Sequence, residues 1–191
     1  PRRDGPGGWT SGPKVVHHDR VEWRVMPDPA TATNALVAGE ADWQEYAYHD
    51  LLPQMRRARG VTVRVLDPSG FVGMVRVNHL QPPFNNPAIR RALWSAIDQT
   101  ACMQALVGAE ETSLYRVPLG FFGPGTPMAS EAGLDPLRGP RDYAKAQADL
   151  RAAGYRGETV LFMIPSPSQP NLAMGTVVAD QLKQAGMNVE V

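Results

Sequence analysis

Residues 159–191, TVLFMIPSPSQPNLAMGTVVADQLKQAGMNVEV, decide the fold of this chain. The apolar run at 159–164 predicts a buried strand, and the alternation at 187–191 predicts a second strand. Between them, residues 170–185 show a helical period that ends before Gly186. Its expected inward residues are Met174, Val178, Leu182 and Ala185. Such a strand, helix and strand unit predicts a parallel pair joined by a right-handed crossover.

Helices are also predicted upstream of this unit. The strongest one begins at Asn85-Asn86-Pro87, and its apolar residues recur at helical spacing. They are Ile89, Leu93, Ala96 and Ile97. Helices are expected at 100–107, ending at Gly108, and from Asp142 to Ala153, closed by Gly154.

The N-terminal part is expected to mix helices with short strands. Residues 1–14 are rich in Gly and Pro and predict a connector, whereas Asp28, Pro29 and Gly39 mark the two ends of a helix. A second helix is expected at 50–59. Strands are predicted at 21–26, 41–43, 61–66 and 71–77, the last two forming a hairpin around the turn at 67–70.

Composition limits the classes of function. The chain has 191 residues, with 19 Lys and Arg against 19 Asp and Glu, so its surface carries no excess of positive charge for nucleic acid. Hydrophobic residues make up 43%, enough for a sizeable core. The N-terminal residue is Pro and the last residues read as a strand without a following turn, so we expect a piece of a longer protein whose signal peptide, if any, has been removed.

Catalytic and metal sites are not predicted. The four histidines, His17, His18, His49 and His79, lack the spacing of metal ligands. No cofactor motif is present. Cys102 lies in an amphipathic helical pattern, which predicts a buried and inert thiol. No Gly-x-Ser-x-Gly motif occurs.

Two groups of residues are candidate ligand contacts. Glu45 and Tyr46 follow the predicted strand at 41–43 and resemble the rim of a cleft, although solvated residues at a strand end would give the same pattern. Phe121 and Phe122 lie in the Gly- and Pro-rich segment 113–140, and a loop of that length is usually either functional or disordered. These two rings either line a ligand pocket or pin the loop to the core.

Four segments in order resemble the family 5 extracellular solute-binding proteins, the dipeptide- and oligopeptide-binding class that serves ABC importers. They are DPATATNALVAGEADW at 28–43, NHLQPPFNNPAIRRALWSAID at 78–98, DYAKAQADLRAAGY at 142–155 and QLKQAGMNV at 181–189. The resemblance implies an α/β periplasmic-binding-protein fold of type II, present in part. Residues 1–44 would form a hinge-proximal segment of the first lobe, and residues 45–191 a C-terminally truncated α/β domain of the second lobe.

The resemblance also implies a function. The protein would be the substrate-binding component of an ABC transporter, without enzymatic activity or cofactor, and would capture a small peptide or peptide-like solute for import. It would act as a monomer with permease subunits in the membrane, in the periplasm or, in a Gram-positive host, outside the cell on a membrane anchor. The expected ligand contacts are Glu45, Tyr46, Phe121, Phe122 and Gln169.

Some dipeptide-binding members of the family use an Arg just before the helix that starts near Pro170. Residues 164–170 contain no Arg here, so a free peptide carboxylate would lose its bidentate partner at that place. Two other classes stay open on the sequence: a hydrolase whose catalytic partners lie outside this chain, and an interaction domain without a small ligand.

Overall fold

The computed structural model describes residues 17–191, which divide into two compact units, one ending at Ala47 and the other running from Tyr48 to Val191. The connector predicted at 1–14 lies outside the described residues. The predicted assignment of residues 1–44 and 45–191 to two lobes stays a prediction.

The first unit is built around helix α1 (Pro29–Ala38). The Asp28 carboxylate accepts a hydrogen bond from the Thr31 backbone N–H at 2.7 Å and so caps the first turn. Gly39 ends the helix at φ +77°, a conformation that a residue with a Cβ rarely adopts. Because these caps are local, the predicted helix is confirmed. The strands predicted at 21–26 and 41–43 are wrong, since these residues pair with no other strand.

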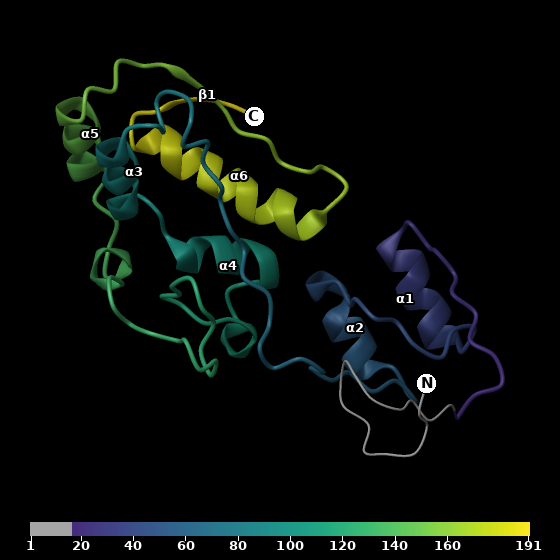
Figure 1. The fold of residues 1–191 in the computed structure, drawn as a ribbon. Helices are drawn as coiled ribbons and strands as arrows, with labels where there is room; N and C mark the ends of the chain where they lie inside the picture. The colour runs from purple at the N-terminus through teal and green to yellow at the C-terminus, as the bar shows by residue number, and fades with distance from the viewer. Residues whose placement is uncertain (1–16) are drawn as a thin grey trace, which may run out of the picture. The chain divides into compact units, whose positions relative to one another are not determined.

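The second unit holds most of the regular structure (Figure 1). Its elements in chain order are η1 (His49–Leu51), α2 (Leu52–Arg57), α3 (Pro87–Ala92), η2 (Leu93–Ser95), α4 (Gln99–Val107), η3 (Thr112–Leu114), η4 (Asp135–Leu137), α5 (Tyr143–Ala152), β1 (Thr159–Leu161), α6 (Gln169–Gln184) and β2 (Asn188–Glu190). The helices predicted in this region are therefore confirmed within a few residues, although the helix after Asn86 turns into a 3₁₀ segment at Leu93.

Strands β1 and β2 are parallel and are connected through α6, as predicted from residues 159–191. Val160 pairs with Val189, and both side chains are buried. The expectation of a fully buried strand at 159–164 is wrong. β1 ends at Leu161, which is 69% exposed, so only one face of the two-stranded sheet is covered.

One hydrophobic core joins helices α3, α4, α5 and α6 with the two-stranded sheet. α3 packs against α5, and α4 packs against α6, with the two strands close to α6 (Figure 1). The apolar face predicted for the helix after Asn86 is confirmed. Ile89, Leu93 and Ala96 are buried, and Ile97 is half-buried and packs against the same cluster. On α6 Val178 and Leu182 are buried and Met174 is half-buried beside them, and Ala185, which caps the end of the helix, is buried too.

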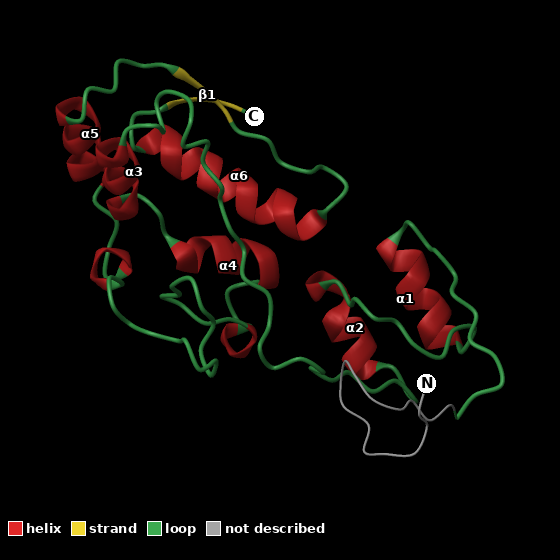
Figure 2. Ribbon diagram, in the orientation of Figure 1, coloured by secondary structure: helices red, strands yellow, loops and turns green. Residues whose placement is uncertain are grey.

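The hairpin predicted at 61–66 and 71–77 does not form, and both segments are loop in Figure 2. The turn between them does form, since the Gly70 N–H donates to the Asp67 carbonyl at 3.3 Å. The second segment instead packs on α6, where a Cβ placed on Gly73 would lie 3.2 Å from Met174 Sδ. Tertiary packing has therefore taken the place of the predicted strand pairing.

Candidate functional site

Tyr46 is tied to helix α1 through the side chain of Gln44. The Thr33 hydroxyl, which is completely buried, donates to Gln44 Oε1 at 3.3 Å, and Gln44 Nε2 donates to the Tyr46 carbonyl at 3.0 Å. The Tyr46 residue nevertheless is 64% exposed, and its neighbour Glu45 is exposed too. The backbone at this position is thus fixed while an aromatic and an acidic side chain face solvent.

Phe121 and Phe122 form an edge-to-face pair on the long loop of the second unit. Their ring centroids are 5.0 Å apart and the ring planes make an angle of 81°. This is a favourable aromatic geometry. Phe121 is 76% exposed and Phe122 39% exposed, so Phe121 does not pin the loop to the core. The pair presents an apolar surface that a ligand could cover.

The backbone that carries these rings is held by side chains rather than by strand pairing. Gln99 at the start of α4 accepts from the Leu119 N–H at 2.7 Å and donates to the Leu119 carbonyl at 2.9 Å. Leu134 is buried, and a Cβ on Gly120 would meet its Cδ2 at 3.4 Å. Thr126 Oγ1 donates to the Gly123 carbonyl at 2.9 Å. The predicted irregular loop is therefore confirmed, and its conformation is supported at several places.

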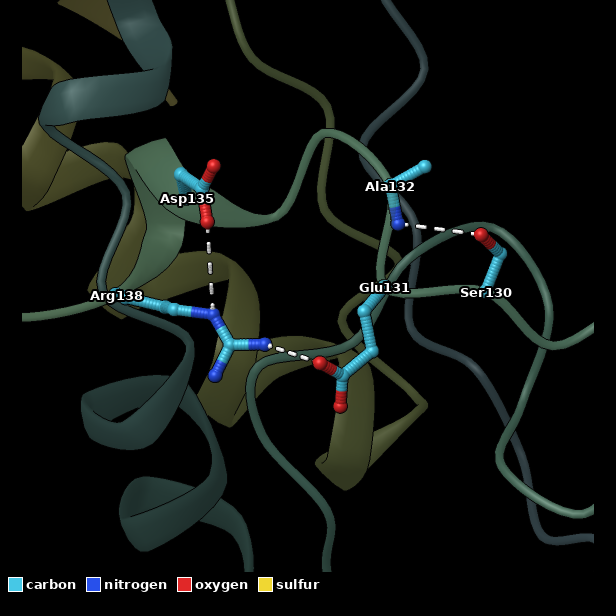
Figure 3. A network of polar contacts seen from close by, with 5 residues as sticks. All are labelled: Ser130, Glu131, Ala132, Asp135 and Arg138. Carbon is cyan, nitrogen blue, oxygen red and sulfur yellow. Dashed lines mark hydrogen bonds and ion pairs between the residues drawn. The ribbon is translucent and has the colours of Figure 1, made fainter.

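A polar network braces the second half of the loop (Figure 3). Arg138 lies between two acidic residues, 2.9 Å from Glu131 Oε2 and 3.9 Å from Asp135 Oδ1, and the Ala132 N–H donates to Ser130 Oγ at 3.1 Å. These exposed ion pairs contribute about 0–1 kcal/mol each, so they add little to the stability of the fold.

Arg141 connects the end of the loop to the core helices. Its guanidinium donates to the Ile97 carbonyl at 2.7 Å and to the Gly139 carbonyl at 2.6 Å. Its buried Nε has no hydrogen-bond partner. The Asp142 N–H donates to the Ser95 carbonyl at 3.0 Å, so the loop rejoins the fold at a fixed point.

Gln169 is the exposed first residue of α6. The segment leading to it is packed closely, because a Cβ on Gly175 would approach Ile164 Cδ1 to 2.9 Å. The structure thus brings Phe121 and Phe122 together and places Gln169 on another element of the same unit. Glu45 and Tyr46 belong to the first unit, and the role of all five residues as ligand contacts stays a prediction.

Catalytic chemistry finds little support in the described residues. Cys102 is buried as predicted, and burial together with the Asp98 carboxylate raises the pKa of its thiol to about 11. Such a thiol is protonated at neutral pH and is a poor nucleophile.

Burial lowers the pKa of His49, an effect that Asp50 and Glu111 partly oppose. Among residues 17–191, no group of three or more His, Cys, Asp or Glu side chains could hold a metal ion, and no helix is long and apolar enough to cross a membrane.

Sequence reasoning missed two residues that shape this site, Gln99 and Gln181. Gln181 lies on the inward face of α6 and is 3% exposed. A polar residue among the expected inward residues of this helix was the available signal for a buried hydrogen bond. Its partner is the backbone of Asp98, 83 positions away, which no local pattern reveals.

The chain is similar to curated solute-binding proteins along its whole length. It is 30% identical to "Probable peptide ABC transporter periplasmic-binding protein y4tO" of Sinorhizobium fredii, over 100% of this chain and 36% of that protein. It is 29% identical to "Glutathione-binding protein GsiB" of Pectobacterium atrosepticum, over 97% of this chain and 34% of that protein. The chain therefore spans about a third of the length of these relatives.

The fold is also found in a solved structure. The crystal structure of the ABC transporter substrate-binding protein CtaP from Listeria monocytogenes superposes with a TM-score of 0.61, at 20% identity, over 87% of this chain and 33% of that one. This similarity confirms the predicted partial periplasmic-binding-protein fold. Residues 8–191 match the family described as "Bacterial extracellular solute-binding proteins, family 5 Middle". The resemblance seen in the sequence is thus confirmed, and the chain belongs to family 5 of the bacterial extracellular solute-binding proteins.

Proposed function

We propose that the protein containing this chain is the substrate-binding component of an ABC importer and captures a small peptide or peptide-like solute. Family membership over residues 8–191 supports this function, as do relatives named for peptides and for glutathione. The observation that carries the proposal in the structure is the exposed Phe121–Phe122 pair on a loop whose backbone is fixed by Gln99.

Each predicted contact has a distinct chemical role toward a peptide. The Phe121–Phe122 pair would pack on an apolar side chain or on the flat face of a peptide group. Glu45 would attract the ligand ammonium group, and Gln169 would exchange hydrogen bonds with a peptide unit. Residues 164–170 contain no Arg, so the cationic partner of a ligand carboxylate comes from outside this segment.

The proposed mode of binding rests on the two-lobed fold that the resemblance to family 5 implies for the whole protein. A ligand held between two lobes stabilises the closed arrangement by its differential affinity for that state. The closed form would then be the state recognised by permease subunits in the membrane. The protein would act as a monomer in the periplasm, or outside the cell on a membrane anchor in a Gram-positive host, without nucleic-acid partners.

A hydrolase is the less favoured alternative. Family 5 consists of solute-binding proteins, and the one cysteine, Cys102, carries a buried thiol whose pKa is about 11. A nucleophile would need a lowered pKa or an adjacent base. An interaction domain without a small ligand is the third class, and it predicts no response to the peptides used below.

Isothermal titration calorimetry of the full-length protein tests the proposal with glutathione, trialanine and pentaalanine. At least one of them is expected to bind, and Phe122→Ala should raise its Kd about fivefold or more, since about 1 kcal/mol of aromatic contact is lost. Leu80→Ala is the matched control, because Leu80 is an exposed apolar residue outside the site and 88% of its surface is accessible. Absence of binding to all three peptides would contradict the proposed substrate class.

A further inference from the structure

Two glutamine side chains connect helix α6 to the loop that carries the Phe121–Phe122 pair. Gln181 of α6 accepts from the Asp98 N–H at 3.1 Å and donates to the Asp98 carbonyl at 3.2 Å. The next residue, Gln99, accepts from the Leu119 N–H at 2.7 Å and donates to the Leu119 carbonyl at 2.9 Å. Each carboxamide, having both a donor and an acceptor, thus pairs with both backbone groups of one residue.

The first of these pairs fixes the start of α4. Gln181 is 3% exposed, so its polar atoms depend on the Asp98 backbone for hydrogen bonds. The Asp98 carboxylate in turn caps α4 by accepting from the Ala101 N–H at 3.0 Å. α4 and α6 also pack directly against each other (Figure 1). The Gln99 side chain therefore extends from a backbone position that the core holds in place.

The second pair fixes the loop close to the aromatic rings. Leu119 is two residues before Phe121, so at most about 7 Å of chain separates their Cα atoms. Gly120 between them packs against the buried Leu134. Holding both backbone groups of Leu119 hence limits the positions open to the two phenylalanine rings.

We infer that Gln99 is a positioning residue that preorganises the Phe121–Phe122 pair for ligand contact, with Gln181 holding Gln99 in place. This inference rests on the proposed function. Ordering a loop when the ligand arrives costs conformational entropy, and a loop that is already held reduces this cost. Gln99 contributes to affinity in this way without touching the ligand.

Hydrogen exchange and calorimetry on the full-length protein test the inference together. In Gln99→Ala, exchange at the Leu119 amide should become at least about tenfold faster, because this N–H loses its acceptor. The Kd for the peptide that binds, whether glutathione, trialanine or pentaalanine, should rise about 5- to 30-fold, which corresponds to about 1–2 kcal/mol at 1.4 kcal/mol per tenfold. Gln99→Glu keeps the size and the acceptor but loses the donor, and its Kd should rise in the same direction.

Gln147→Ala is the matched control. The Gln147 amide also donates to a backbone carbonyl, that of Gln184 at 2.9 Å, but this hydrogen bond joins α5 to the end of α6 and does not involve Asp98, Gln99 or Leu119. It should change neither the exchange at Leu119 nor the Kd. Gln181→Ala should speed exchange at both Asp98 and Leu119 and also lower the thermal midpoint, since it leaves the half-buried Asp98 N–H without its acceptor, whereas the Asp98 carbonyl keeps the Cys102 N–H as a partner.

The outcomes separate the inference from the proposed function. Unchanged exchange at Leu119 in Gln99→Ala would overturn the role of Gln99 in holding the loop. Faster exchange with an unchanged Kd would overturn preorganisation, while leaving peptide binding by the protein intact. If the unmodified protein binds none of the three peptides, the proposed substrate class fails, and preorganisation for these ligands fails with it, even if the exchange result shows that Gln99 holds the loop.

Discussion

Leu150 provides the sharpest test of the core described for residues 48–191. It is 2% exposed, is among the largest completely buried side chains, and lies on α5 within the cluster formed with α3, α6 and the two strands. Leu150→Ala would leave a cavity that the surrounding helices fill only in part. Leu→Ala substitutions at such sites lower the free energy of unfolding by about 2–5 kcal/mol. Because Leu150 is almost completely buried, we expect a loss in the upper part of this range, about 3–5 kcal/mol.

Urea denaturation followed by circular dichroism measures this loss. With a slope of about 2 kcal/mol per molar urea, the midpoint should fall by about 1.5–2.5 M. Leu161→Ala is the matched control, because this leucine is 69% exposed on β1 and its loss should cost no more than about 0.5 kcal/mol. Equal midpoint shifts in the two variants would refute the description of the core.

Three further predictions concern the packing at Gly175 and the chemistry of Cys102. Gly175→Ala should destabilise the fold by about 1 kcal/mol or more despite the better helix propensity of Ala, because its Cβ would approach Ile164 Cδ1 to 2.9 Å, and adding Ile164→Val should recover part of the loss in the same denaturation assay. Cys102 should react with a thiol reagent at least tenfold more slowly in the native than in the unfolded protein, and comparable rates would contradict its burial. Because burial raises the pKa of this thiol from about 9 to about 11, the native state retains its proton while the unfolded state loses it between these values. The free energy of unfolding should therefore fall from pH 9 to pH 11, and it should fall less in the Cys102→Ala variant.

The helices could be predicted from the sequence because the signals that begin and end them are local. Asp28, Asn86 and Asp142 each accept a hydrogen bond from a backbone N–H two or three residues further on, so the cap and the helix lie within one short segment. The family could be recognised for a related reason, since its motifs are contiguous stretches read in order.

The strands and the candidate site depended on tertiary structure. A strand needs a partner for its backbone groups, and residues 61–66 and 71–77 remain loop, although the turn between them forms as predicted. The exposure of Phe121 likewise could not be read from two adjacent aromatic residues, which fit a ligand pocket and a core anchor equally well.

What the sequence by itself determined about this protein is its family, its helices, the parallel strand pair and the buried cysteine. Tertiary structure alone decided which side chains hold the loop backbone beside the aromatic pair. The Gln99–Leu119 and Gln181–Asp98 hydrogen bonds join residues 20 and 83 positions apart. The physical reason is that a carboxamide can pair with any peptide group, so its partner is selected only when packing brings one particular backbone segment within reach.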